Sequence, residues 1–249
     1  MSEIASEAFN LQLLIAALAC FGGTFLQGYA GFGGGLIIIP MMTIIYAPIE
    51  GIAAGTISGF LGQLSIIPEA VRGTDRRESL PVLTAVAITT PLCAMLFLAN
   101  SDPRTIKVII GAFVIAFGLL LMAGINYRGP RGPLAGLAVG SSVGTLTGSI
   151  GAPASPIYAA YFLSSNAPVR VQRANLSLTT VLVIGMIAAG LAMAGKIGMV
   201  DVVRGFSLTP PAVAGAWCGA AMFRRMPASW FRPIALWLLI CAGLAAIFL

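Results

Sequence analysis

Two glycine-rich stretches are the places in this sequence where backbone groups could bind a ligand. The first runs from Gly31 to Gly35 and the second from Gly148 to Pro153, and a short apolar run follows each. Each stretch would end one helix and start another, so that unpaired N–H groups and the positive end of a helix dipole face the break. Helix N-termini of this kind bind anions. Glycine also omits the side chain that would keep a ligand from the backbone.

Polar side chains near the two stretches could add hydrogen-bond donors, and neither stretch contains a carboxylate that would repel an anion. Thr24, Thr145 and Thr147 are such neighbours. We predict a substrate-binding site composed of Gln27, Tyr29, Gly31, Gly33, Gly34, Gly35, Ser149, Gly151, Ala152, Ser155, Tyr158, Arg173 and Asn175.

Glycine in membrane helices also serves the close packing of one helix on another. Two series recur every four residues and are predicted to pack, namely Gly136, Gly140, Gly144 and Gly148, and Gly51, Gly55 and Gly59. The consecutive glycines 33–35 differ, because they share no helix face and each weakens a helix by about 1 kcal/mol. A binding break is therefore favoured there.

Two basic residues, Arg170 and Arg173, come just before Asn175 at a predicted helix start, where the helix dipole disfavours a cation. Two explanations stay open: the arginines mark the cytoplasmic side of a membrane, or they attract an anionic substrate to the cytoplasmic mouth. The polar residues on this helix form either interhelical hydrogen bonds or a cavity wall. They are Asn175, Ser177, Thr179 and Thr180.

The chain that must position these residues is a membrane protein by composition. Of 249 residues, 58% are hydrophobic and 9% are charged, with a mean hydropathy of +0.97, which leaves too little polar surface for a water-soluble protein. The 14 basic residues are scattered between apolar runs and form no patch, so nucleic acid is not a predicted partner. The chain has no histidine and its four cysteines stand apart, so we predict no metal and no cofactor.

Apolar runs between charges and turn residues predict helical elements at 9–30, 35–47, 50–68, 79–99, 105–125, 132–148, 153–164, 174–195, 203–223 and 231–249. A spanning helix needs about 20 apolar residues, so the second and seventh elements are too short to cross. We expect each to form a hairpin with the helix before it, entering the membrane and returning to its own side. A break at membrane depth is tolerated where it lines a buried cavity.

Basic residues predict the orientation, since loops rich in Lys and Arg stay in the cytoplasm. With both hairpins, ten of the 14 basic residues lie inside, and the exceptions are Arg104, Lys107, Lys196 and Arg204. The half at about 1–126 then begins outside with a hairpin and three spans, and the half at about 127–249 repeats this order beginning inside. We predict an all-α polytopic membrane protein with one transmembrane domain, 1–249, in the plasma membrane, here the bacterial inner membrane. Its two inverted repeats each comprise a broken-helix hairpin plus three transmembrane helices.

Interrupted segments at matching places in two halves are typical of the binding site of a secondary transporter. No acidic residue is expected at mid-membrane depth, so neither a proton relay nor acid–base catalysis is predicted. We predict an exporter of small anions, with an anion channel as the alternative and a membrane-embedded enzyme disfavoured. The predicted partners are the small anionic substrate and the lipid bilayer, and a homodimer stays open.

The run Gly28–Pro40, with the sequence GYAGFGGGLIIIP, resembles the first-repeat motif of the TauE/SafE sulfite exporter family, also called the toluene sulfonate uptake permease family. The run Gly148–Tyr158, followed by Arg173 and Asn175, is similar to the second motif of that family, with Ala152 and Ala154 in place of Gly and Pro. The length and the order of the repeats also match. This resemblance implies transport of sulfite, thiosulfate, sulfonates or carboxylates.

Overall fold

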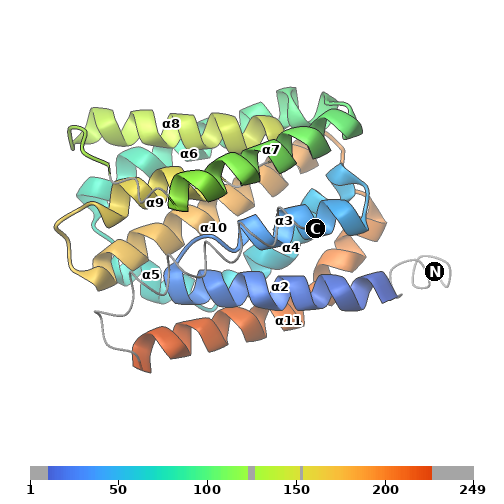
Figure 1. Ribbon diagram of the computed structural model, residues 1–249, viewed down its shortest axis with the longest axis horizontal. Coiled ribbons are helices and arrows are strands. Elements are labelled where there is room, and N and C mark those ends of the chain that lie inside the picture. Colours follow the sequence, from blue (N-terminus) through green and yellow to red (C-terminus); the bar gives the residue numbers. More distant parts are fainter. Residues whose placement is uncertain (1–10, 123–126, 152–153, 226–249) are drawn as a thin grey trace.

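The computed structural model describes residues 11–122, 127–151 and 154–225, and all regular structure in these ranges is helical. The predicted helix at 231–249 and the predicted site residue Ala152 lie outside the described residues. In chain order the elements are α2 (Leu11–Ala30), α3 (Gly35–Ile45), α4 (Pro48–Gln63), α5 (Ile67–Gly73), α6 (Arg76–Leu96), the 3-10 turn η1 (Leu98–Asn100), α7 (Pro103–Met122), α8 (Pro133–Ile150), α9 (Ser155–Leu163), α10 (Val169–Met193) and α11 (Met199–Arg225) (Figure 1).

Three elements of the described chain are long and apolar enough to cross a membrane: α2, α6 with η1, and α10. The pair α4 and α5 meets this requirement only together, and the two helices are bent by 68° at their junction. The prediction of a single continuous element at 50–68 is therefore wrong, because the chain forms two helices there. The bend has a local cause, because Pro68 in the first turn of α5 lacks an N–H and restricts the residue before it. α3 has 11 residues and α9 has nine, so both are short, as predicted.

Most helix starts differ from the prediction by a few residues, and two of these differences concern the predicted site. α9 begins at Ser155 and not at 153, and α10 begins at Val169, ahead of the predicted start at 174. Pro168 permits the earlier start of α10, because its carbonyl accepts from the Val171 N–H at 2.8 Å and the Gln172 N–H at 3.0 Å. Arg170 and Arg173 thus lie within the first turns of α10 and not before it.

The helices pack in pairs that small residues make possible. α8 packs along α6, and the predicted glycine series on α8 faces that partner. A Cβ atom on Gly140 would strike the Val82 carbonyl oxygen, and one on Gly148 would lie 2.5 Å from the Thr90 carbonyl oxygen. The packing prediction for this series is confirmed.

A second close pair joins α2 to α11. A Cβ atom on Gly28 would strike the carbonyl oxygen of Ala216, and one on Gly219 would strike that of Phe25. In both pairs, α6 with α8 and α2 with α11, glycine residues therefore let the two helices pack closely. Between them runs α10, which packs against α4, α5, α6 and α9 and lies near the centre of Figure 1.

Gly140→Ala tests the glycine packing, with Gly22→Ala as its matched control. Nothing lies within 4 Å of a Cβ atom placed on Gly22. We expect Gly140→Ala to destabilise the protein by roughly 1–3 kcal/mol through overpacking, whereas Gly22→Ala should be neutral or stabilising by roughly 0.5–1 kcal/mol through helix propensity. Thermal unfolding of the purified protein in detergent measures both. Equal melting temperatures for the two variants would contradict the packing.

Candidate functional site

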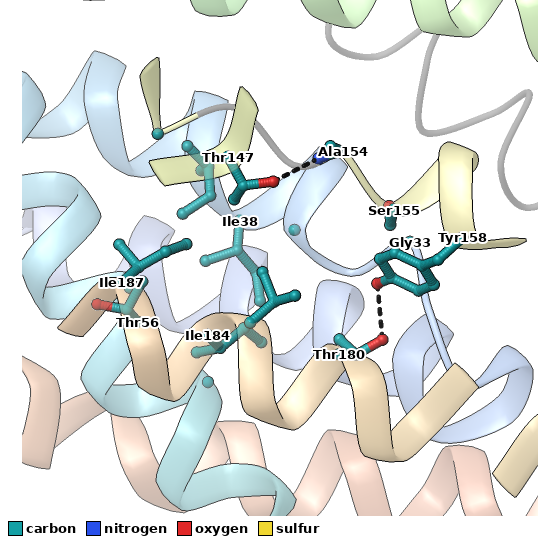
Figure 2. Close-up of a pocket in the computed structure, with 16 residues that line it drawn as sticks. Gly33, Ile38, Thr56, Thr147, Ala154, Ser155, Tyr158, Thr180, Ile184 and Ile187 are labelled. Carbon is teal, nitrogen blue, oxygen red and sulfur yellow. Dashed lines mark hydrogen bonds between the residues drawn. The ribbon is translucent and has the colours of Figure 1, made fainter. Parts of the chain in front are cut away.

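The two glycine-rich breaks meet at one small cavity inside the protein (Figure 2). Gly33 and Gly35 line it from the first break, and Gly151, Ala154 and Ser155 line it from the second. Its volume is about 40 Å³, far below the roughly 300–1,000 Å³ of pockets for drug-sized ligands. The cavity therefore suits a small ion and not an extended molecule.

The first break is made by glycines with left-handed backbone angles. Gly31 has φ +85° and Gly33 has φ +89°, a region that other residues rarely adopt. The Gly31 N–H donates to the Gln27 carbonyl at 2.7 Å and closes α2, and the Leu36 N–H donates to the Gly33 carbonyl at 3.0 Å and opens α3. The first turn of α3 therefore begins at the cavity.

The second break likewise joins the end of one helix, α8, to the start of another, α9, through a left-handed glycine. Gly151, with φ +68°, caps the end of α8, and its N–H donates to the Thr147 carbonyl at 2.9 Å. The Ala154 N–H donates to Thr147 Oγ1 at 3.3 Å, and α9 then begins at Ser155. The Thr147 side chain thus holds the start of α9 against the end of α8.

The other walls come from α4 and α10. From α4 come Gly55, Thr56 and Gly59, and from α10 come Thr180, Val183, Ile184 and Ile187. The packing prediction for the glycine series on α4 is confirmed at Gly51, where a Cβ atom would strike the Met42 carbonyl oxygen. It missed that Gly55 and Gly59 line a cavity. A threonine flanked by glycines within an apolar helix is the sequence signal that could have identified this wall.

A chain of hydrogen bonds connects α9, α10 and the first break. Tyr158 Oη lies 2.8 Å from Thr180 Oγ1, and Thr180 Oγ1 donates to the Gly31 carbonyl oxygen at 2.8 Å (Figure 2). Because the single hydroxyl proton of Thr180 points to carbonyl oxygens, the Tyr158 hydroxyl must be the donor to Thr180. Thr180 therefore fills both of the roles that its sequence left open, since it lines the cavity and also makes hydrogen bonds to other elements.

Several predicted site residues lie beside the cavity and not on it. A Cβ atom on Gly34 would strike the Gly23 carbonyl oxygen, so that glycine packs α3 on α2. The Gln27 amide lies next to Gly34, is fully buried, and has no hydrogen-bond partner among the described residues. Tyr29 is buried with its ring edge-on to Phe223, and Ser149 is half-buried and does not line the cavity.

Arg173 has a role that neither predicted explanation anticipated. Its Nε donates to the Tyr29 carbonyl at 3.1 Å and its Nη2 donates to the Gly28 carbonyl, both in the last turn of α2. The side chain also forms an ion pair with Glu69 at 3.3 Å. A cation is favourable at the C-terminus of a helix, so Arg173 is stabilised by the dipole of α2 while it sits in the first turns of α10.

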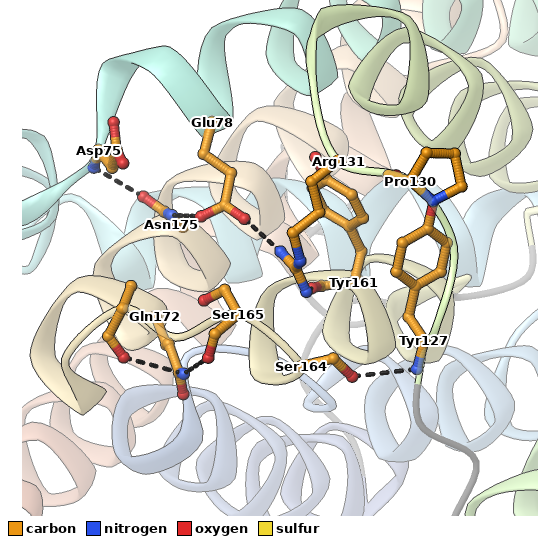
Figure 3. A network of polar contacts seen from close by, with 11 residues as sticks. Asp75, Glu78, Tyr127, Pro130, Arg131, Tyr161, Ser164, Ser165, Gln172 and Asn175 are labelled. Carbon is orange, nitrogen blue, oxygen red and sulfur yellow. Dashed lines mark hydrogen bonds and ion pairs between the residues drawn. The ribbon is translucent and has the colours of Figure 1, made fainter.

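Asn175 also lies away from the cavity, in a network of polar contacts that joins α6 to α10 (Figure 3). Its Oδ1 accepts from Thr74 Oγ1 at 2.6 Å and from the Asp75 N–H at 2.9 Å, and its Nδ2 donates to Glu78 at 3.4 Å. Glu78 in turn forms an ion pair with Arg131. Asn175 therefore provides interhelical hydrogen bonds, and its prediction as a substrate-binding residue has no contact with the cavity to support it.

The long apolar helices define a multi-pass membrane protein, and the comparison with known families is more specific. The family model described as sulfite exporter TauE/SafE matches residues 15–246, nearly the whole chain. The chain therefore belongs to this family of membrane transporters, which confirms the resemblance seen in the two motifs. No curated protein and no solved structure matches the chain.

Tyr158→Phe and Thr180→Val test the hydrogen-bond chain at the cavity. Loss of one hydrogen bond is worth about 1 kcal/mol, roughly fivefold in rate. We expect each variant to lower sulfite flux in proteoliposomes by about this factor or more. The double variant should transport no worse than Thr180→Val alone, because contacts in one network are not additive.

Thr179→Val is the matched control, since the Thr179 hydroxyl is buried and, among the described residues, donates within its own helix, to the Asn175 carbonyl at 2.8 Å. Its flux should stay within about twofold of wild type, below the effect of one lost hydrogen bond. A double variant whose loss equals the product of the two single losses would show that Tyr158 and Thr180 act independently.

Proposed function

We propose that this protein is a secondary transporter that exports small anions, such as sulfite, other sulfur oxoanions, sulfonates or carboxylates, from the cytoplasm. The observation that carries the proposal is the meeting of both glycine-rich breaks at one cavity. Two broken helices that contribute to a single small cavity are typical of the central site of a transporter that works by alternating access.

The preference for an anion rests on the helices that begin at the cavity. α3 starts at Gly35 and α9 starts at Ser155, and both residues line the cavity. The positive ends of two helix dipoles therefore face the cavity, beside the end of α8 at Gly151. No acidic residue lines the cavity in the described part of the chain.

Binding by dipoles also suits release. Apart from the hydroxyl side chains of Thr56, Thr147, Tyr158 and Thr180, the remaining walls are apolar, from Ile38, Ile39, Val183, Ile184 and Ile187, and no arginine or lysine lines the cavity in the described part of the chain. Dipoles act strongly in such low-dielectric surroundings, yet an anion held without a full counter-charge avoids the tight pairing that would slow its departure. A transporter needs both binding of its substrate and fast release.

The proposal includes two inverted repeats, at about 1–126 and 127–249. Three correspondences support it: α2 with α3 resembles α8 with α9, α8 packs along α6 as α2 packs along α11, and α10 packs on α6 as α4 packs on α11. In this scheme, α4 and α10 are equivalent helices that meet at the centre and form the cavity wall. Rocking of one repeat against the other would open the cavity to each side in turn.

The proposed orientation places the end with Arg72, Arg131 and Arg173 in the cytoplasm. Contacts gather these parts at one end: Asp75 with Asn175, Glu78 with Arg131, and the Tyr127 N–H with Ser164 Oγ at 3.0 Å (Figure 3). The last contact brings the chain after α9 back beside the chain that leads into α8, which supports a hairpin that returns to its own side. With the cell interior negative, each exported negative charge gains about 2.3 kcal/mol per 100 mV.

Gly59→Leu tests whether the cavity lies on the transport path. A Cβ atom on Gly59 meets only Ile184, at 3.8 Å, so the backbone tolerates a side chain there, and a leucine would fill the cavity. We expect counterflow of labelled sulfite in proteoliposomes to fall more than roughly tenfold, the effect of a 1.4 kcal/mol barrier.

Gly22→Leu makes the same substitution on α2 where nothing lies within 4 Å, and its counterflow should be preserved. Saturable counterflow separates a carrier from a channel. Wild-type counterflow in Gly59→Leu would place the path elsewhere, and a wild-type protein that moves none of the sulfur oxoanions, sulfonates or carboxylates would refute the proposed function.

A further inference from the structure

A second and larger cavity lies at the end of the protein that holds Arg173. Its volume is about 710 Å³, and it is enclosed by α5, the first turns of α10 and the last turn of α11. Of its lining, the predicted substrate site included Arg173, and attraction of an anion to the cytoplasmic mouth was one of the two explanations left open for Arg170 and Arg173. We call it the arginine vestibule and define it by Arg72, Arg170, Arg173 and Arg224, the acidic Glu69, and Ser177.

The charge of the arginine vestibule is strongly positive. Four arginines and one glutamate line it, a balance of 4 − 1 = +3. Glu69 forms ion pairs with Arg173 and with Arg224, each at 3.3 Å, so its negative charge is paired with these two arginines. No carboxylate of the described chain lies within ion-pair distance of Arg72 or Arg170. Two guanidinium groups are therefore available to an anion, and guanidinium geometry matches an oxoanion with two parallel hydrogen bonds.

Ser177 supplies an independent sign of a ligand. Ser177 is one of the residues that line the vestibule and is 2% exposed, yet its hydroxyl has no hydrogen-bond partner among the described residues. A buried hydroxyl without a hydrogen-bond partner destabilises the folded protein by about 1–3 kcal/mol, so we expect a function that offsets this cost. A bound anion would accept the hydroxyl proton and provide that function.

The position of Ser177 also connects the vestibule to the central cavity. A side-chain carbon on Gly31 would lie 3.0 Å from Ser177 Oγ, so the hydroxyl lies against the first glycine-rich break. Thr180, one turn further along α10, lines the central cavity and donates to the Gly31 carbonyl. Ser177 and Thr180 both lie against Gly31, so the vestibule and the central cavity are linked through this turn of α10.

We infer that the arginine vestibule is a second binding site, for a small oxoanion, formed by Arg72, Arg170 and the Ser177 hydroxyl. Its role as the entrance to the central cavity rests on the proposed function, but its capacity to bind does not. Sulfite or sulfate from the cytoplasm and the phosphate of a lipid headgroup share the chemistry that these residues recognise. The vestibule captures the anion with full charges, and the central cavity then holds it with dipoles alone.

The binding experiment uses sulfate and isothermal titration calorimetry on the full chain in a zwitterionic detergent. Gly59→Leu serves as the background, because it fills the central cavity and leaves the vestibule as the site. In this background we expect sulfate to bind, and Arg170→Gln and Ser177→Ala each to weaken its binding about tenfold, as for one charge-assisted hydrogen bond. Arg104→Gln removes the same charge from an exposed site outside the vestibule and should bind sulfate normally.

Thermal unfolding without sulfate separates a binding role for Ser177 from a structural one. Removal of an unpartnered buried hydroxyl should raise the melting temperature or leave it unchanged while sulfate affinity falls. A purely structural serine would lose stability on substitution and retain its affinity. That result would overturn the assignment of Ser177.

Native mass spectrometry identifies the source of the oxoanion. A phospholipid that stays bound to the wild-type protein and is lost from Arg170→Gln assigns the site to a headgroup, whereas sulfate binding without a retained lipid assigns it to a free anion. If Arg170→Gln and Arg104→Gln are alike in both measurements, there is no such site. Flux measurements distinguish a failure of this inference from a failure of the proposed function. Arg170→Gln should raise the KM for internal sulfite and preserve the maximal rate. If the proposed function is wrong, the wild-type protein shows no flux.

Discussion

A helix can end inside a membrane protein only where its last carbonyl groups find partners, because lipid offers none. The end of α2 meets this requirement through α10. Arg173 donates to the carbonyls of Gly28 and Tyr29, and Thr180 donates to the carbonyl of Gly31. Without these donors the first break would leave buried acceptors unpaired, each at a cost of about 1–3 kcal/mol.

This constraint gives α10 its place at the centre of the protein. The same helix satisfies the first break through Arg173 and Thr180 and contacts α9 through Thr180 and Tyr158. A displacement of α10 would therefore act on both breaks at once. A cavity formed by two breaks can change its access to each side only if the breaks move relative to each other, and α10 is the element that contacts both.

Part of this arrangement could be predicted from the sequence. Consecutive glycines and short apolar runs indicated both breaks and the short helices α3 and α9, because these features depend on local backbone preferences. Gly33, Gly35, Gly151, Ser155 and Tyr158 were predicted for the site and line the cavity. The four-residue glycine series on α8 predicted a packing face, since its spacing matches a helix face.

The rest depends on which residues meet across the fold, and local patterns in a sequence do not reveal these contacts. The roles of Arg173 and Asn175 follow from partners 97 to 145 positions away along the chain. For the same reason the wall from α4 was missed and the wall from α10 was left as one of two alternatives, since Thr56 and Thr180 look like ordinary polar residues until their neighbours are known. The bend between α4 and α5 was missed although Pro68 signalled it, because the apolar run continues through the junction.

The most direct test of the central claim is a crystal structure with selenite, an anion with the shape of sulfite, measured at the selenium absorption edge. We expect an anomalous peak in the central cavity, between Gly33 and Gly35 on one side and Gly151 and Ser155 on the other. A saturating concentration of selenite that leaves this cavity without a peak, whatever it shows in the arginine vestibule, would contradict the claim that the two breaks together form the binding site.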